Sequence, residues 1–149
     1  GFEQEIKERL VLFGVKVVEL KVLTQIRDGI YSTGELCKES DGEKICEQSV
    51  VIKTAKGLTV ICGCAHPGIV SIIQYVKEQF NSVVFHLIGG FHLKNNNTAT
   101  NTFVIKNLQA LGVRRISPTH CTGKYAARIM RQVFGQGFVK VKEGDTIEL

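Results

Sequence analysis

The sequence contains no hydrophobic run long enough to cross a bilayer. Its longest apolar runs, such as residues 83–88, fall far short of the roughly 20 residues that a transmembrane helix needs. No N-terminal stretch combines a basic flank, an apolar centre and a small-residue cleavage site, so we expect no secretion signal and no membrane partner, although the chain begins at Gly1 rather than Met. Internal repeats and Pro/Ser-rich linkers are also missing. The length of 149 residues therefore favours one domain over residues 1–149.

Several catalytic and nucleotide-binding motifs are absent as well. No Gly-x-Ser-x-Gly elbow occurs, which gives a serine hydrolase of that type no support. Neither a P-loop nor a Gly-x-Gly-x-x-Gly fingerprint is found. Hydrophobic residues make up 44% and charged residues 22%, which is ordinary for a folded soluble domain.

The net charge of +5 is spread thinly along the chain. Arg114–Arg115 is the densest basic pair, and no basic stripe interleaved with aromatics appears, so nucleic acid is not an expected partner. A modest positive field favours a phosphorylated substrate. A solvated surface that happens to be basic explains the charge equally simply.

The five cysteines indicate thiols in a reducing cytoplasm, because their number is odd and no secretory context is visible. Cys37 and Cys46 bracket a polar stretch and can form a disulfide under oxidising conditions, but small buried residues or incidental loop thiols are the preferred interpretation. Cys121 lies beside His120 and ahead of an expected helix, so we rank it behind His120 as a ligand candidate.

The first half of the chain is rich in expected strands. Apolar periodicity predicts a helix over residues 2–13, and the valine-rich segment 15–23 predicts a strand. We expect a second strand over residues 25–36, interrupted at Gly29 and Gly34. The remaining expected elements are a polar surface loop over 37–47 and a hairpin of 49–54 with 58–62.

The second half alternates between strands and helices. Its expected elements are a helix from Pro67, a strand over 83–88, a helix between the polar loop 94–98 and Gly112, a strand over 113–117, a helix capped by Thr122 that ends at Gly135, and short strands over 138–141 and 146–149. Such alternation predicts an α/β (α+β) fold, with helices packed on a sheet.

Three of the four histidines follow expected strands, each in a turn marked by glycine or proline. They are His66 in Cys-Gly-Cys-Ala-His-Pro-Gly, His92 in Gly-Gly-Phe-His-Leu and His120 in Pro-Thr-His-Cys-Thr-Gly. Ligands of α/β folds bind outside the carboxyl ends of the strands, and imidazole is the commonest protein ligand for zinc. We therefore predict a shared metal site. His86 lies inside a strand and is expected to be a core residue.

A catalytic metal bound by three imidazoles keeps one coordination position open and supplies a hydroxide nucleophile near neutral pH. Each histidine also has a simpler interpretation, as a helix cap or a surface turn residue. Next to the expected metal site, Thr122, Gly123 and Lys124 begin a helix, where amide groups and the lysine can hold a phosphate or carboxylate. An ordinary threonine cap is the alternative there.

These motifs, in this order and spacing, resemble the metallo-β-lactamase superfamily. The matching segments are 47–51 (Glu-Gln-Ser-Val-Val), 57–69 with His66, 88–93 with His92, 111–113, and 118–123 with His120. Within the superfamily they look most like the dihydropterin–ribofuranosylaminobenzene-phosphate synthase-like metal-dependent hydrolases. The resemblance covers most of the chain from about Gly29 onward.

The resemblance implies an αββα sandwich with a metal site at one edge of its two sheets. His66 matches the single histidine ligand from the middle of the family's fold, and His120 matches its last histidine ligand. His92 falls near the place where many members have a bridging aspartate, and residues 89–91 offer no carboxylate. His92 either replaces that ligand or contacts substrate.

The superfamily's main metal motif, His-x-His-x-Asp-His, does not occur in these 149 residues. The chain therefore resembles the C-terminal half of such an enzyme, as a fragment, a processed product or a separately encoded half. Half a sandwich exposes a sheet face, and such surfaces associate. We expect a partner, either an N-terminal half or a second copy of this chain.

The function implied is a metal-dependent hydrolase or synthase. It acts through metal-activated hydroxide on a small substrate, phosphorylated or not, and is incomplete without an N-terminal half. Zinc is the first choice of metal, with manganese or iron as alternatives, because imidazole ligands accept several metals. The competing interpretation is a non-catalytic assembly domain with a vestigial metal site.

Overall fold

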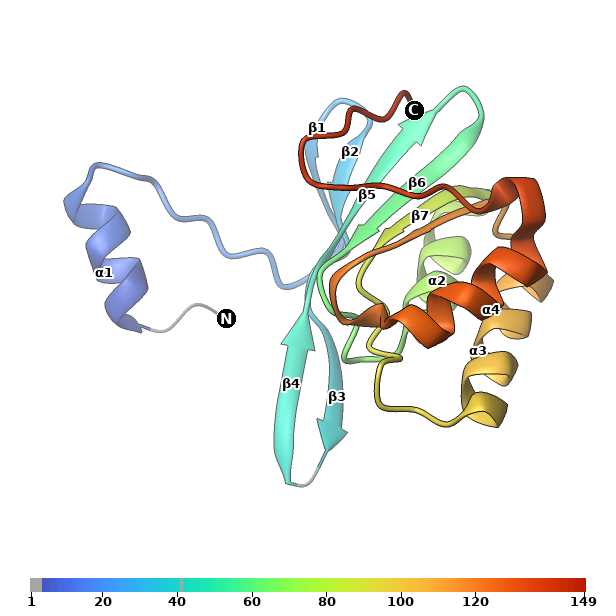
Figure 1. Ribbon diagram of the computed structural model, residues 1–149. Helices are drawn as coiled ribbons and strands as arrows, with labels where there is room; N and C mark the ends of the chain where they lie inside the picture. Colours follow the sequence, from blue (N-terminus) through green and yellow to red (C-terminus); the bar gives the residue numbers. More distant parts are fainter. Residues whose placement is uncertain (1–3, 41) are drawn as a thin grey trace.

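A six-stranded mixed sheet forms the centre of the computed structural model, which describes residues 4–40 and 42–149 (Figure 1). The strands next to one another in the order β1-β2-β5-β6 pair antiparallel, and β6, β7 and β8 pair parallel. In sheet order the strands are β1 (Thr24–Arg27), β2 (Ile30–Ser32), β5 (Ser49–Thr54), β6 (Gly57–Cys62), β7 (Val84–Gly89) and β8 (Arg115–Pro118).

Three helices cover one face of this sheet (Figure 1). They are α2 (Ile69–Phe80), α3 (Thr98–Ala110) and α4 (Lys124–Phe134), with short 3-10 turns η1 (His120–Thr122) and η2 (Gly135–Gly137) before and after α4. The predicted α/β class, a mixed sheet with helices packed on one face, is confirmed.

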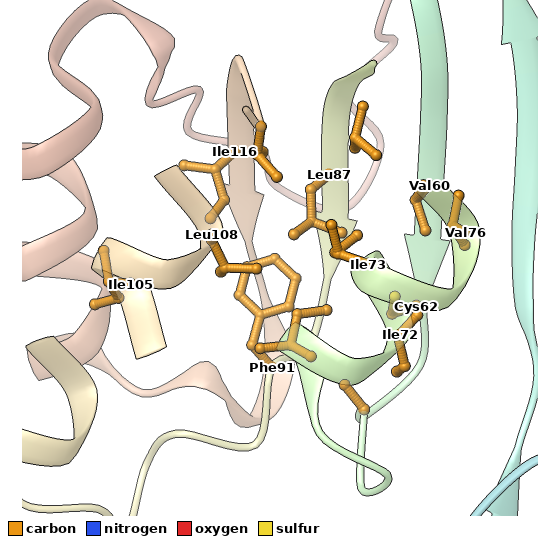
Figure 2. Packing of buried hydrophobic residues seen from close by; sticks show 14 of the residues in the cluster. Val60, Cys62, Ile72, Ile73, Val76, Leu87, Phe91, Ile105, Leu108 and Ile116 are labelled. Carbon is orange, nitrogen blue, oxygen red and sulfur yellow. The ribbon is translucent and has the colours of Figure 1, made fainter. Parts of the chain in front are cut away.

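The core lies between the helices and the helix-facing side chains of the strands. Val60, Leu87 and Ile116 are paired across β6, β7 and β8, and each is fully buried. Figure 2 shows these side chains meeting Ile73 of α2 and Leu108 of α3. Burying an aliphatic side chain of this size contributes about 1.5–3 kcal/mol, so this layer holds the three parallel strands in place.

The opposite face of the sheet is less well covered. Side chains alternate along a strand, so Ile61 of β6 points away from the helices, and 37% of it is exposed. Its paired neighbours Val50 and Ile88 are only partly buried. Nearer the C-terminal segment, His86 and Ser117 on this face are fully enclosed. The central strands thus present an apolar row that the described residues cover only in part.

The N-terminal helix α1 (Gln4–Leu12) lies apart from the sheet and buries no residue (Figure 1). An ion pair between Lys7 and Glu19 joins it to the segment that follows. Residues 15–23, predicted to be a strand, have no regular structure, because no neighbouring strand pairs with their alternating valines. Phe2, the expected start of the helix, lies outside the described residues.

The prediction of a surface loop over residues 37–47 is wrong. This segment belongs to a two-stranded hairpin of β3 (Leu36–Ser40) and β4 (Glu43–Glu47), which projects from the body of the protein (Figure 1). Cys37 and Cys46 are directly paired in it and form a disulfide, so the preference for thiols at these two positions is also wrong. A hairpin exposed on both faces needs no apolar alternation, which is why the sequence looks like a loop.

Other boundaries also differ from the predictions. The strands expected over 138–141 and 146–149 are irregular, apart from one isolated bridge between Ile116 and Phe138. The segment 25–36, expected as a strand interrupted at Gly29 and Gly34, does turn at Gly29 and forms β1 and β2, and β2 ends at Ser32. Helix α2 begins at Ile69 rather than Pro67, and α4 begins at Lys124 after Gly123.

Within the described part of the chain, no helix is long and apolar enough to span a membrane.

His86 is a core residue, as predicted. It is 1% exposed, its Nε2 lies 2.8 Å from Ser117 Oγ, and its Nδ1 has no hydrogen-bond partner among the described residues. Desolvation, followed by the nearby positive charge of Arg115, lowers the pKa of this imidazole from 6.5 to about 4. The folded protein therefore holds His86 neutral where the unfolded chain would bind a proton.

This gives a prediction about acid stability. Because the pKa of His86 is lower in the folded state, its contribution is present above pH 6.5 and is lost as the pH falls towards 4. The loss amounts to about 3 kcal/mol of unfolding free energy between pH 7 and pH 4. Urea unfolding of the wild type and of His86→Gln across this range measures it. The difference between the two should shrink by that amount on acidification, and parallel curves would contradict the assignment.

Candidate metal centre

The loops that follow β6, β7 and β8 meet at one edge of the sheet. These strands are parallel and in adjacent positions, so their carboxyl ends lie together. His66 lies in the loop after β6, His92 in the loop after β7, and His120 in the turn after β8. The sheet topology therefore brings all three predicted histidines to the same edge.

Hydrogen bonds hold these loops against one another. Gly90 N donates to Gly63 O at 2.9 Å, which joins the loops after β7 and β6, and Lys94 N donates to Cys121 O at 3.2 Å, which joins those after β7 and β8. The buried hydroxyl of Thr122 accepts a hydrogen bond from Phe91 N at 3.1 Å. The edge is thus a connected framework of loop backbone.

The glycine pair Gly89–Gly90 makes the close approach possible. A Cβ at Gly89 would lie 2.1 Å from Cys62 O, and its φ of 132° is in the region that favours glycine. A Cβ at Gly90 would lie 2.5 Å from Gly63 O and 2.8 Å from Cys121 Sγ. A side chain at either position would force the loops apart.

Three residues other than glycine at this edge have positive φ angles. They are Ala65 at 58°, His92 at 51° and His120 at 45°, next to or within the histidine motifs. Such conformations cost on the order of 1 kcal/mol or more each, and they persist where the surroundings fix them. Only one other described non-glycine residue, Asn81 at the end of α2, shares this feature.

A carboxylate from the β3–β4 hairpin contacts His66. Glu47, the last residue of β4, pairs through Oε1 with His66 Nδ1, and its Oε2 accepts a hydrogen bond from His66 N at 3.1 Å. The ring of His92 is tilted at 52° to the ring of His66, with centroids 4.4 Å apart. A carboxylate at Nδ1 leaves Nε2 of His66 free to bind a ligand.

Two cysteines lie beside these histidines. Donor atoms of Cys64, His120 and Cys121 lie within 4.8 Å of one another, and so do donor atoms of Glu47, Cys64 and His66. Cys64 is common to both groups, which places His120 next to the pair formed by His66 and Glu47. Burial, together with the neighbouring Cys121, raises the pKa of the Cys64 thiol.

Cys62 is a thiol of a different kind. It belongs to the core, is 6% exposed and accepts a hydrogen bond from Ser49 Oγ at 3.4 Å. Burial raises the pKa of its thiol to about 11. This residue is inert at neutral pH.

A pocket of about 240 Å³ opens beside the histidines. Lys38 of β3 is the only charged side chain among the described residues that line it. The polar part of the lining also contains His66, His92 and Asn96. The apolar part comes from α2, α3 and the loops after β6 and β7, with Ala65, Ile69, Val70, Phe91, Leu93 and Val104. A pocket of this composition suits a small molecule with an apolar body and a negatively charged group.

The predicted substrate-binding residues Thr122, Gly123 and Lys124 lie outside this pocket. Thr122 is 2% exposed and engaged with Phe91, and a Cβ at Gly123 would lie 2.8 Å from Lys94 Cα. Lys124 is exposed at the first turn of α4. The structure places the rings of His66 and His92 in contact and connects His120 to His66 through Cys64, whereas Thr122 and Gly123 pack against the loop after β7. Their part in binding stays a prediction.

Sequence reasoning gave no role to Glu47, Cys64 or Lys38. The only available indication for Cys64 was its position two residues before His66. For Glu47 and Lys38 no local pattern existed, because their positions depend on how the hairpin docks beside the sheet.

Comparison with known proteins agrees with these motifs. The chain is 37% identical over 103 residues to the 7,8-dihydropterin-6-methyl-4-(β-D-ribofuranosyl)-aminobenzene-5′-phosphate synthase of Methanocaldococcus jannaschii, an alignment of 68% of this chain and 35% of that protein. It is 26% identical over 149 residues to an uncharacterized protein of the same archaeon, covering 89% of this chain and 55% of the other. No family model matches the chain.

A solved structure shares the fold. The crystal structure of Tm1679, a metal-dependent hydrolase of the β-lactamase superfamily, superimposes with a TM-score of 0.76 at 27% identity, covering 91% of this chain and 58% of that one. The resemblance to the metallo-β-lactamase superfamily and to its dihydropterin synthase-like branch is confirmed. The chain spans between about a third and three fifths of the length of these proteins.

Proposed function

We propose that this chain, which has a metallo-β-lactamase-like fold, forms the histidine-bearing half of a metal-dependent hydrolase or synthase. The observation that carries the proposal is the position of His66, His92 and His120 in three loops at the carboxyl edge of parallel strands, with the rings of His66 and His92 4.4 Å apart. Relatives of known description, a synthase and a metal-dependent hydrolase, share this part of the fold.

The donor set fits a divalent metal ion. Imidazoles of His66, His120 and His92 would hold it, and each is at least partly exposed at the edge. A bound divalent metal supplies a hydroxide nucleophile near neutral pH. The strained backbone at Ala65, His92 and His120 is consistent with a site arranged for binding rather than for stability.

Glu47 is proposed as the positioning residue of His66. Its carboxylate fixes the orientation of the ring and keeps the proton on Nδ1, so that Nε2 is the donor atom offered to the metal. The second contact, from His66 N to the same carboxylate, ties the loop backbone to the hairpin. Ring and loop are therefore held by one side chain.

The pocket beside the histidines is proposed to bind a small anionic substrate. Lys38 provides the positive charge, and the apolar wall from α2 and α3 accommodates the rest of the molecule. A phosphate ester is the class that this combination fits best. The M. jannaschii synthase has such a group in the name of its product, which supports the same choice.

The open sheet face is proposed to pair with an N-terminal half of the fold. Ile61 is 37% exposed at the centre of the row formed with Val50 and Ile88, where it would be buried by a second sheet. The chain covers 58% of the Tm1679 chain, so the related fold contains further residues to supply that layer. In the absence of such a half, a second copy of this chain is the expected occupant.

Metal content tests the proposed centre. Wild-type protein purified from zinc-supplemented medium should retain metal, measured by inductively coupled plasma mass spectrometry, and His66→Ala should lose it. Glu47→Gln should weaken metal affinity by roughly 10- to 100-fold, because it removes the charged partner of His66. His86→Gln changes the one histidine away from the edge and should leave metal content unchanged. A wild type without metal would favour the assembly-domain alternative.

Phosphate binding tests the pocket. Lys38→Ala should weaken the binding of inorganic phosphate by about 10-fold, equivalent to ~1.4 kcal/mol, when binding is followed by phosphorus NMR with chelator present. Lys44→Ala removes an exposed lysine of the same hairpin that does not line the pocket, and should have little effect. If Lys124→Ala weakens phosphate binding and Lys38→Ala does not, the anion binds at the start of α4 instead.

The open sheet face predicts self-association of the chain alone. Light scattering after size exclusion should show a dimer or larger species, and Ile61→Glu should convert it to a monomer by placing a charge in the apolar row. Phe103→Glu is the matched control, because Phe103 is 70% exposed on α3, on the helical side. A concentration-independent monomer for the wild type would count against this surface as an interface.

A further inference from the structure

Two cysteines at the histidine edge form a donor set that the proposed histidine ligands do not include. We infer that Cys64, His120 and Cys121 bind a thiophilic divalent cation of the zinc class through two thiolates and one imidazole. The inference rests on the proposed function, because it concerns the same edge of the sheet, and it adds ligands that decide which metal is held. Donor atoms of the three residues lie within 4.8 Å of one another.

The surrounding backbone is shaped around Cys121. His92 N donates a hydrogen bond to Cys121 Sγ at 3.3 Å, and the sulfur lies 3.5 Å from Cys64 O. A Cβ at Gly90 would lie 2.8 Å from this sulfur and 2.5 Å from Gly63 O, so glycine at this position leaves room for both. The loop after β7 therefore contacts this sulfur through the backbone N–H of His92 and leaves space for it at Gly90.

The thiols are also accessible in a way that core thiols are not. Cys64 and Cys121 are partly exposed and His120 is exposed, whereas Cys62, two residues before Cys64, is buried in the core. Metal ligands at an edge need this combination of partial access and fixed position. The neighbouring Cys62 provides an internal example of what a structural cysteine looks like in this fold.

Cys64 connects the group of His120 and Cys121 to the group of His66 and Glu47. Its sulfur belongs to the group with His120 and Cys121 and to the group with His66 and Glu47. Residues 89–91 provide no carboxylate at this edge, and Cys64 is the residue whose sulfur lies near donor atoms of both His66 and His120. A cation bound by Cys64 therefore lies within reach of donors from both groups.

The ligand chemistry selects the metal. Soft thiolate ligands favour zinc and cobalt over manganese and magnesium, whereas imidazoles alone discriminate little among transition metals. On binding, each of the two thiols releases its proton to the buffer, so two thiolates and a neutral imidazole balance the 2+ charge of the ion. The inference thus removes manganese from the open choice among zinc, manganese and iron and keeps zinc as the expected metal.

Cobalt(II) titration of the full chain under anaerobic, reducing conditions tests the inference. Thiolate–cobalt bonds give an intense near-ultraviolet charge-transfer absorption, which imidazole and carboxylate ligands do not give. The wild type should show this band, and zinc should abolish it by displacement. Cys64→Ser and Cys121→Ser should each lose most of its intensity, and Cys62→Ser should retain it.

The outcomes separate this inference from the proposed function. Cobalt that binds with weak visible bands but without the charge-transfer band would overturn the thiolate site and leave the histidine centre standing. Absence of cobalt binding to the wild type would overturn both. A band that persists in the double variant Cys64→Ser/Cys121→Ser would assign the sulfur ligand elsewhere and overturn the inference.

A measurement on the wild type avoids dependence on variants that fail to fold. Zinc-loaded and chelator-treated protein are alkylated with iodoacetamide, and the modified cysteines are identified by peptide mass spectrometry. Zinc should protect Cys64 and Cys121 by at least several-fold, while buried Cys62 stays unmodified in both samples. Equal modification of Cys64 and Cys121 with and without zinc would overturn the inference.

Discussion

Parallel pairing of β6, β7 and β8 is the constraint from which the rest of the edge follows. Parallel neighbours end on the same side of a sheet, so three loops separated by about 30 residues each along the chain emerge together. Val60, Leu87 and Ile116 fix that pairing from the helical side. The Gly89–Gly90 pair then lets the loops touch backbone to backbone, which turns a shared location into a defined arrangement of side chains.

The sequence revealed the histidines because their placement is a local property. An apolar run followed by glycine or proline and then histidine can be recognised within ten residues. The parallel arrangement of the strands then brings the histidines to one edge of the sheet. Glu47 and Lys38 could not be identified from the sequence, because their roles depend on where the β3–β4 hairpin packs in the tertiary structure. Cys64 escaped notice for another reason: a cysteine in an apolar context looks like a core residue until its neighbours are known.

The same distinction between local and tertiary information explains the fold predictions. Helices α2 and α4 and strand β7 were predictable because amphipathic stripes and flanking glycines mark them in the sequence. Residues 15–23 and 138–149 alternate in the manner of strands but have no paired neighbour along their length, so they stay irregular. Conversely, β3 and β4 pair fully although their sequence is polar, since cross-strand pairing and a disulfide need no buried face.

The bond between Cys37 and Cys46 has a consequence for the neighbouring side chains. Lys38 follows one sulfur in the sequence and Glu47 follows the other, so a single covalent link restrains both the cation of the pocket and the carboxylate that contacts His66. The disulfide therefore closes the hairpin next to the two side chains through which it contributes to the histidine edge, without any sulfur of that pair reaching the histidines.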